Sequence, residues 1–279
     1  MEKQNKIPKT IHCVWLSGDP LPEQYQECLD SWKKCMPDYE IKLWDAKTSP
    51  IEEVLFVKQA YTARKWAYAT DYIRLYALYH HGGIYLDLDV FVYKSFDPFL
   101  HHGAFSSTEL DHRIFYEQLR KKEKEPKGLG IEAAVIGAQK GHPWIKDLMD
   151  FYENREFIND PAYYWNIIMP RVMTKISLEK YGFKFIPVYQ ILKEDVHLYP
   201  PDVFSMQNPP SEIKYSSHIC AHSWYEGKKQ TNSLKKFILE KIIGKNNWNK
   251  IKNVLKKEKP KKNLFDFEQY YGKENYKNK

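Results

Sequence analysis

The segment AYATDYIRLYALYHHGGIYLDLDV, residues 67–90, joins a helix pattern to a strand pattern through two adjacent glycines. Apolar residues recur at helical spacing between residues 60 and 81, and Gly82-Gly83 supplies the expected C-terminal stop. The run IYLDLDVFVY, residues 84–93, follows directly and is rich in β-branched and aromatic residues, which predicts a strand. A helix that leads straight into such a strand is typical of α/β proteins.

The flanking sequence continues this alternation of strands and helices. On the N-terminal side we expect a β-α-β unit with a strand over 7–16, a helix over 22–35 and a strand over 41–44. On the C-terminal side we expect a strand over 131–138, a helix over 143–152, a helical stretch over 161–181 that includes Pro170, and short strands over 186–223. The pattern predicts an α/β fold with a mostly parallel central sheet that helices cover on both faces.

The composition is that of a folded protein in a reducing compartment. Hydrophobic residues make up 43% of the 279 residues and charged residues 28%, which is enough to bury a large core. The four cysteines include no C-x-x-C pair, so neither a disulfide framework nor a zinc ribbon is expected. Because no signal-peptide pattern and no run of eighteen apolar residues occurs, we expect a cytoplasmic protein that does not span the membrane.

The net charge of +7 is unevenly distributed along the chain. Thirteen lysines and two glutamates lie between 228 and 262, a local charge of +11, whereas residues 1–227 carry −4. We therefore predict one folded domain over 1–227 and a basic, amphipathic helical extension over 228–279. The segment 228–262 is suited to an anionic membrane surface, or it packs on the domain with a solvated basic face. The acidic domain argues against nucleic acid as a partner.

Two carboxylates in the 84–93 strand indicate a metal site. Period-two geometry places Asp87 and Asp89 on one face together with Tyr85, roughly 7 Å apart along the strand. Like charges in an otherwise apolar strand are costly unless a cation neutralises them. Carboxylate oxygens favour Mg²⁺ or Mn²⁺, ions that also bind substrate phosphates. The alternative is a pair of solvated aspartates in a turn.

The preceding helix carries a second polar pair. Asp71 and Arg74 are three residues apart and share a helix face, so they could form an ordinary surface salt bridge. However, their face leads directly into the carboxylate strand. A guanidinium there would offer fixed, bidentate donors to phosphate or sugar hydroxyls, and the carboxylate would orient it.

Further candidates lie at the two ends of the predicted domain. Trp15 ends the first strand, where ligands of open α/β sheets bind, although most tryptophans in such positions pack against the core. The segment YSSHICAHSWYEG, residues 215–227, contains His218, His222 and Trp224. One of its histidines could supply a third metal ligand, and Trp224 could cover a bound ligand.

Together these stretches resemble the glycosyltransferases with a DXD-containing sugar-binding region, a group that includes bacterial capsular-polysaccharide transferases, fungal initiating mannosyltransferases and, more distantly, clostridial glucosylating toxins. The block of residues 67–90, with its D-x-x-R and G-G-x-Y-x-D-x-D pattern, carries most of the resemblance. The other matching stretches are IPKTIHCVWLSG, GIEAAVIGAQKGHPW, LYPPDVFS and HICAHSW. The resemblance spans about 220 residues in the order of the family.

The resemblance implies a GT-A-type, Rossmann-like domain that binds a nucleotide sugar, with UDP favoured, and a divalent ion, usually Mn²⁺. It implies retention of the anomeric configuration and a saccharide or lipid-linked acceptor, as in capsular or lipopolysaccharide synthesis. Carried over by position, the catalytic residues would be Asp87, Asp89 and Arg74. The donor would be held by Trp15, Asp71, Arg74, Tyr85, Asp87 and Trp224, and the metal by Asp87, Asp89 and His218 or His222.

Some features leave alternatives open. Ala133 and Met206 replace an Asn and a Pro common in the family, which weakens any assignment of the sugar. We expect no protein nucleophile, and Glu132 is the nearest candidate for one. The alternatives are a protein-modifying glucosyltransferase of the toxin type and an inactive carbohydrate-binding relative. An enzyme that uses a lipid-linked acceptor would work as a peripheral protein at the inner face of the cell membrane.

Overall fold

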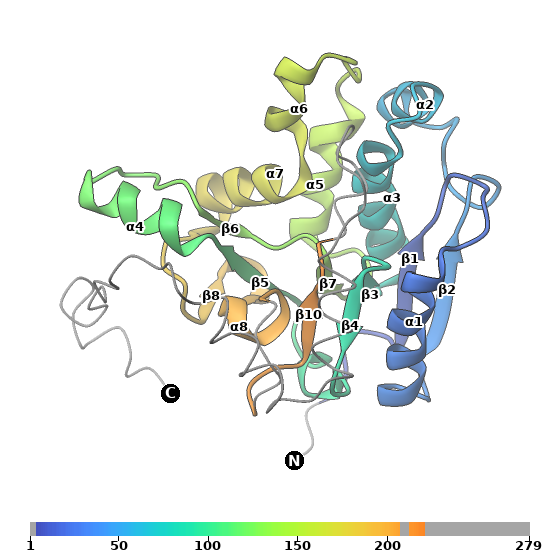
Figure 1. The fold of residues 1–279 in the computed structure, drawn as a ribbon, viewed down its shortest axis with the longest axis horizontal. Helices are drawn as coiled ribbons and strands as arrows, with labels where there is room; N and C mark the ends of the chain where they lie inside the picture. Colours follow the sequence, from blue (N-terminus) through green and yellow to red (C-terminus); the bar gives the residue numbers. More distant parts are fainter. Residues whose placement is uncertain (1–3, 207–211, 221–279) are drawn as a thin grey trace, which may run out of the picture.

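The computed structural model of the chain describes residues 4–206 and 212–220, in which strands and helices alternate as the sequence predicts (Figure 1). The strands are β1 (Thr10–Val14), β2 (Glu40–Trp44), β3 (Gly83–Leu86), β4 (Val90–Val92), β5 (Ala104–Leu110), β6 (Leu129–Ile131), β7 (Val135–Ala138), β8 (Gln190–Leu192), β9 (Val196–Tyr199) and β10 (Ser216–His218). The helices are α1 (Glu23–Cys35), α2 (Leu55–Thr62), α3 (Trp66–His81), α4 (His112–Arg120), α5 (Pro143–Glu153), α6 (Pro161–Ile167), α7 (Met169–Ile176) and α8 (Pro201–Phe204).

Within the described residues, the central sheet has the strand order β2-β1-β3-β7-β5-β9-β8, with β6 paired to β5. Strands β2, β1, β3, β5 and β9 run in one direction, whereas β7, β8 and β6 run against their neighbours. The prediction of an α/β fold with a mostly parallel sheet is therefore confirmed. Strand β4 leaves this sheet and pairs with β10 in a separate antiparallel ribbon.

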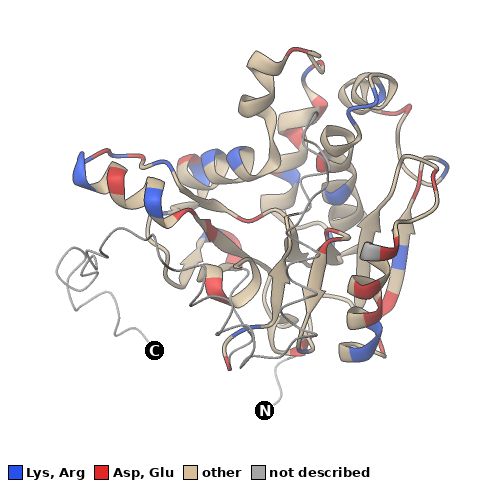
Figure 2. Ribbon diagram, in the orientation of Figure 1, with Lys and Arg blue, Asp and Glu red and all other residues tan. Residues whose placement is uncertain are grey.

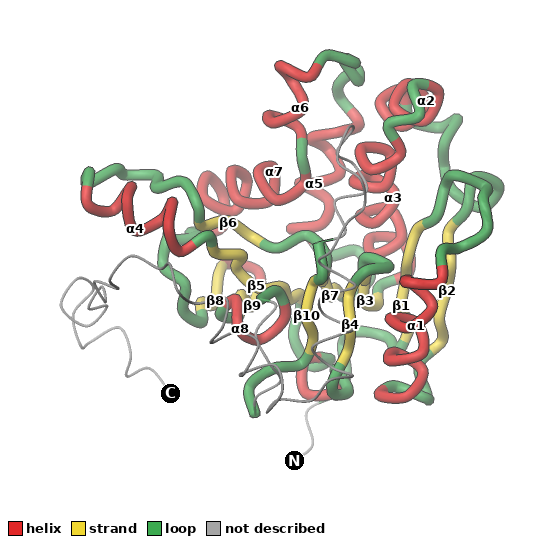
Figure 3. The backbone as a smooth tube through the Cα atoms, viewed as in Figure 1, coloured by secondary structure: helices red, strands yellow, loops and turns green. Residues whose placement is uncertain are grey.

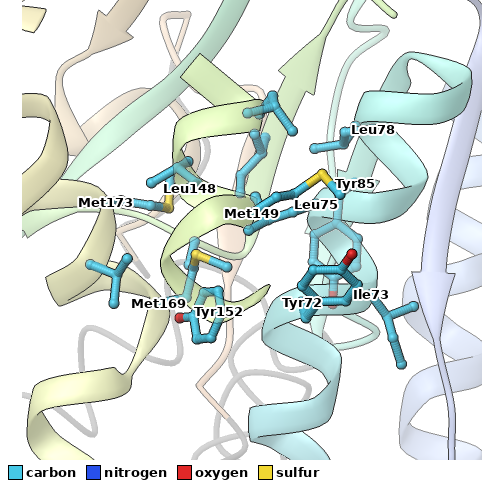
Figure 4. Close-up of a cluster of buried hydrophobic side chains, with 14 of the residues drawn as sticks. Tyr72, Ile73, Leu75, Leu78, Tyr85, Leu148, Met149, Tyr152, Met169 and Met173 are labelled. Carbon is cyan, nitrogen blue, oxygen red and sulfur yellow. The ribbon is translucent and has the colours of Figure 1, made fainter. Parts of the chain in front are cut away.

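Helices cover both faces of the sheet (Figure 3). One core contains side chains from α2, α3, α5 and α7, together with Tyr85 of β3 (Figure 4). The second core lies on the opposite face and contains side chains from α1 and α8, together with Ile84 and Leu86. Alternate residues of β3 therefore belong to different cores, as the period of a strand buried on both faces requires.

Four predicted elements are interrupted. The strand predicted over 84–93 ends at Leu86 and resumes at Val90, and the one over 131–138 is likewise divided into β6 and β7. The helix over 60–81 is two helices, α2 and α3. The helical stretch over 161–181 breaks at Ile168, where extended backbone precedes Pro170 in the first turn of α7.

Charged residues gather on the helices and connecting loops (Figure 2). Among the described residues, no helix is both long and apolar enough to cross a membrane. The predicted boundary after Gly227 and the extension over 228–279 lie outside the described residues, so both stay predictions.

Candidate active site

The two aspartates of the D-x-D motif lie in a turn, not on one face of a continuous strand as predicted. Strand β3 ends at Leu86, the turn covers Asp87 to Asp89, and β4 begins at Val90. The Val90 N–H donates to the Asp87 carbonyl at 2.9 Å and closes the turn. The Asp87 N–H donates to the carbonyl of Ala134, just before β7, at 2.9 Å. The carboxylates therefore project from a backbone that is fixed on both sides.

His218 of β10 joins these aspartates because β10 pairs with β4. Its Nε2 lies 3.4 Å from Asp89 Oδ1 and 4.0 Å from Asp87 Oδ2. One ligand atom from each of the three residues fits within a span of 4.8 Å. Their side chains are 26%, 11% and 19% exposed for Asp87, Asp89 and His218, so the group is accessible from solvent. Two carboxylates and an imidazole suit Mn²⁺ or Mg²⁺ with positions left for other ligands.

The charges around this group also favour a bound cation. Burial raises the pKa of Asp87, and the neighbouring Asp89 raises it further, whereas Arg74 lowers it. Burial opposes protonation of His218, but Asp89 and Glu132 together raise its pKa well above its usual range. The raised pKa of His218 reflects the carboxylates around it, and a divalent ion between Asp87 and Asp89 would offset their mutual repulsion.

Arg74 of α3 connects the site to the rest of the domain. Its Nη2 lies 2.9 Å from Asp71 Oδ1, and its Nη1 donates to the Ala133 carbonyl at 2.7 Å and lies 3.4 Å from Asp87 Oδ1. Its guanidinium carbon lies 4.6 Å from the centre of the Tyr85 ring, whose hydroxyl donates to Asp87 Oδ1 at 2.6 Å. The guanidinium therefore has a single orientation, fixed by three carbonyl or carboxylate groups and one ring.

Asp71 and Arg74 do not form the surface salt bridge that was the alternative from the sequence, because both are buried. The backbone N–H of Met169, at the start of α7, donates to Asp71 Oδ2 at 3.2 Å. Burial raises the pKa of Asp71 to about 7, with Arg74 acting in the opposite direction. The pair therefore ties α7 to α3 beside the D-x-D turn.

Trp15 lies at the same edge of the sheet as the turn. Strands β1 and β3 are parallel neighbours, with His12 opposite Tyr85, so Trp15 and Asp87 both follow C-terminal strand ends. The Trp15 indole N–H donates to the Asp19 carbonyl at 2.7 Å, and its ring packs edge-on against Tyr25. A role in base stacking stays a prediction. The two other candidates, His222 and Trp224, lie outside the described residues.

Two acidic residues lie beside the site in positions that the sequence did not predict. Glu132 was considered only as a nucleophile, yet its Oε1 lies 3.1 Å from His218 Nδ1. Glu109 of β5 was not considered; burial and the nearby Glu132 raise its pKa to about 8. The sequence does contain a sign of a special role for Glu132, because it is an acidic residue within the otherwise apolar run GIEAAVIGA.

Comparison with known families finds a match for the segment that contains Asp71, Arg74 and the D-x-D turn. Residues 22–106 match the family model "Glycosyltransferase sugar-binding region containing DXD motif". Residues 22–106 are therefore similar to the sugar-binding region of the DXD glycosyltransferases. The matched segment of this DXD glycosyltransferase region includes α1, α3 and the D-x-D turn, and the resemblance noted from the sequence is confirmed.

Curated relatives of the chain include fungal proteins and a protein of Acanthamoeba polyphaga mimivirus. Inositol phosphoceramide mannosyltransferase 3 of Schizosaccharomyces pombe is 31% identical over 143 residues, which cover 50% of this chain and 35% of that protein. Mannosyl phosphorylinositol ceramide synthase CSH1 of Saccharomyces cerevisiae is 33% identical over 164 residues, covering 53% and 37%. The chain thus spans little more than a third of these relatives.

Among solved structures, the PaToxG glycosyltransferase has a TM-score of 0.43 and 18% identity, covering 62% of this chain and 70% of that one.

Proposed function

We propose that the chain is a glycosyltransferase that transfers a sugar from a nucleotide sugar to an acceptor hydroxyl with the help of a divalent metal ion. The observation that carries this proposal is the Asp87–Asp89–His218 group at the C-terminal edge of β3. The family match supports the same reaction class. Mn²⁺ is the ion that we propose, with Mg²⁺ as the alternative.

Each side chain has a task in this reaction. Asp87, Asp89 and His218 would hold the ion, which when bound supplies positive charge that stabilises the departing diphosphate. The Arg74 guanidinium, oriented by Asp71, would donate hydrogen bonds to the donor sugar or its phosphate. Tyr85 fixes Asp87 through its hydroxyl, so that the carboxylate keeps one orientation during turnover. We infer retention of configuration, with attack of the acceptor hydroxyl on the leaving-group side.

The acceptor that we propose is a saccharide or a lipid-linked saccharide, with the enzyme at the cytoplasmic face of a membrane. The named relatives act, by their names, in mannosyl transfer to inositol phosphoceramide. These names add mannose donors to the UDP-sugars considered from the sequence, and they favour a lipid acceptor over capsular or lipopolysaccharide chains.

The test is a screen of UDP-glucose, UDP-galactose, UDP-N-acetylglucosamine and GDP-mannose for slow hydrolysis in the presence of Mn²⁺. Hydrolysis needs no acceptor, so it tests the donor site alone. We expect one donor to release its nucleoside diphosphate and Asp89→Asn to abolish this release, because the substitution removes one charged metal ligand. Thermal unfolding checks that the variant is folded.

Asp38→Asn is the matched control, because Asp38 is a surface carboxylate whose side chain is 57% exposed and pairs with Lys9. It should keep the wild-type rate. An Asp89→Asn variant with wild-type hydrolysis would contradict the proposed metal site. Donor binding without any hydrolysis or transfer would favour the inactive carbohydrate-binding relative.

A further inference from the structure

Glu132 is a buried carboxylate that is held rigidly beside the candidate metal group. It lies in the link between β6 and β7 and is 3% exposed. Its backbone N–H donates to the Ser107 carbonyl at 2.8 Å, and its carbonyl accepts the Ser106 hydroxyl at 2.8 Å. Its side-chain Oε1 accepts the Ala134 N–H at 2.9 Å. Both the backbone and the carboxylate of Glu132 are therefore anchored to β5 and to the start of β7.

The anchored carboxylate faces His218 on the side away from the aspartates. Glu132 Oε1 lies 3.1 Å from His218 Nδ1, whereas His218 Nε2 lies 3.4 Å from Asp89 Oδ1. An imidazole that donates Nδ1–H to a carboxylate has its lone pair on Nε2, the nitrogen directed at the aspartates. Glu132 thus selects the tautomer that a metal ligand needs, and it also fixes the plane of the ring.

We propose that Glu132 is the positioning residue of the metal site: its carboxylate accepts the Nδ1–H of His218 and aims Nε2 at the ion held by Asp87 and Asp89. This inference rests on the proposed function, because it assumes that these three residues bind a divalent ion. Glu132 is not a nucleophile, since its Oε1 already accepts hydrogen bonds from Ala134 and His218 and the side chain is enclosed.

Glu109 provides a matched comparison within the same part of the fold. It lies at the end of β5, opposite Gly130, and is close enough to Glu132 and His218 for their charges to act on it. Glu109→Gln replaces a second buried carboxyl near the site with its neutral amide and leaves the contact between Glu132 and His218 in place. It therefore separates a general effect of changing a nearby buried carboxyl from the effect of the hydrogen bond to Nδ1.

The experiment measures Mn²⁺ affinity by the electron paramagnetic resonance signal of the free ion, without nucleotide. Wild type, Glu132→Ala, Glu132→Gln and Glu109→Gln are compared in the full chain. Because outer partners of metal-bound histidines change affinity by about 10- to 100-fold, we expect a loss of that size for Glu132→Ala. Glu132→Gln should recover most of the affinity through its amide oxygen, and Glu109→Gln should change it less than about threefold.

A second measurement reads the histidine directly. Nitrogen-15 NMR of the Mg²⁺-loaded wild type should show His218 with its proton on Nδ1, in a signal that His218→Asn removes. In Glu132→Ala the His218 signal should show the proton on Nε2 or a mixture of tautomers. The wild-type spectrum decides the case even if Glu132→Ala does not fold, because a proton on Nε2 there would overturn the inference.

The outcomes distinguish the inference from the function on which it rests. A wild type that binds no Mn²⁺ would refute the metal site itself, and the role of Glu132 with it. A wild type that binds Mn²⁺ while folded Glu132→Ala binds it equally well would overturn only the role of Glu132. Equal losses in Glu132→Ala and Glu109→Gln would also overturn it, because the change of any buried carboxyl near the site would then explain the effect.

Discussion

His12 is a histidine that the fold keeps uncharged. It is fully buried in β1, its Nε2 lies 2.8 Å from the Gly82 carbonyl, and the Trp44 indole N–H donates to its Nδ1 at 3.1 Å. Because Nδ1 accepts a hydrogen bond, the proton must be on Nε2. Burial lowers the pKa of His12 from 6.5 to about 4, with the hydrogen bond to Gly82 acting in the opposite direction.

This depressed pKa predicts a loss of stability in mild acid. Between pH 6.5 and 4 the unfolded chain binds a proton at His12 that the folded chain does not, so the free energy of unfolding falls as pH falls. From pH 7 to pH 5, the titration of His12 lowers the free energy of unfolding by about 2 kcal/mol. Urea unfolding at pH 7, 6 and 5 should show a pH dependence that is smaller by this amount in His12→Gln than in wild type. Parallel curves for the two proteins would refute the assignment.

The contacts of Arg74 depend on the planar shape of its guanidinium as well as on its charge. A lysine keeps the charge but cannot contact Asp71, Asp87 and the Ala133 carbonyl together, because it has one donor group in place of a planar fork. We expect Arg74→Lys to lower donor hydrolysis by about 100-fold or more and to cost about 2 kcal/mol of stability. Donor hydrolysis and thermal unfolding measure the two effects. Arg113→Lys, on the surface of α4, is the control, and similar rates for both variants would contradict the role of Arg74.

At the scale of elements, the junction between α3 and β3 depends on two glycines. Gly83 has φ +112°, and a Cβ there would lie 2.6 Å from the carbonyl oxygen of Thr10 in the neighbouring β1. The backbone of β1 cannot move away without breaking its pairing with β3. The turn preference of glycine alone predicts a helix end at Gly82-Gly83, and Gly82 is the C-cap of α3.

Gly83→Ala should therefore destabilise the protein by more than the cost of a positive φ. Gly141 is the matched control, because it has φ +74° and no atom within 4 Å of an added Cβ. We expect about 1 kcal/mol for Gly141→Ala from backbone strain and at least about 2 kcal/mol more for Gly83→Ala from the contact with Thr10. Urea unfolding measures both values. Equal values would mean that β1 and β3 separate easily at this junction.

The interrupted strand explains what the sequence could and could not predict about the site. Alternating apolar residues placed Ile84 and Leu86 on one face and Tyr85 on the other, and the two cores confirm this. The same alternation predicts that Asp87 and Asp89 continue the strand on the face of Tyr85. That prediction is wrong, because β3 ends at Leu86. The Asp87 N–H bonds to Ala134, a residue some fifty positions away, and the chain turns toward β10. Local pattern does not encode such a long-range partner.

At the scale of the whole molecule, strand direction brings Glu132 to the site. Strand β7 runs antiparallel to β3, with Val135 opposite Leu86, so the residues before β7 lie next to the residues after β3. A parallel β7 would have placed Glu132 at the far edge of the sheet. Apart from Glu132, residues 131–138 are apolar on both faces, so their pattern predicts a buried strand but does not specify its direction. The proximity of Asp71, Arg74, Asp87 and Asp89 was predictable because one short segment contains all four.

The charge of the basic segment 228–262 predicts that the full chain binds anionic membranes. This segment carries a charge of +11 with apolar residues at helical spacing, whereas residues 1–227 carry −4. Each basic residue near an anionic surface contributes about 1 kcal/mol, so the segment should hold the protein on anionic vesicles against the repulsion of the domain. We expect the full chain to float with phosphatidylserine vesicles in a density gradient and not with phosphatidylcholine vesicles.

A chain that ends at Gly227 should remain at the bottom of the gradient with both kinds of vesicle. Addition of about 0.5 M salt should release the full chain, because screening weakens attraction to surface charge. Flotation of the shortened chain would place the membrane contact on the domain instead. Equal flotation of the full chain on both lipids would show that apolar insertion, and not charge, governs the contact. A full chain that never floats would favour the other interpretation, a helical extension packed against its own catalytic domain.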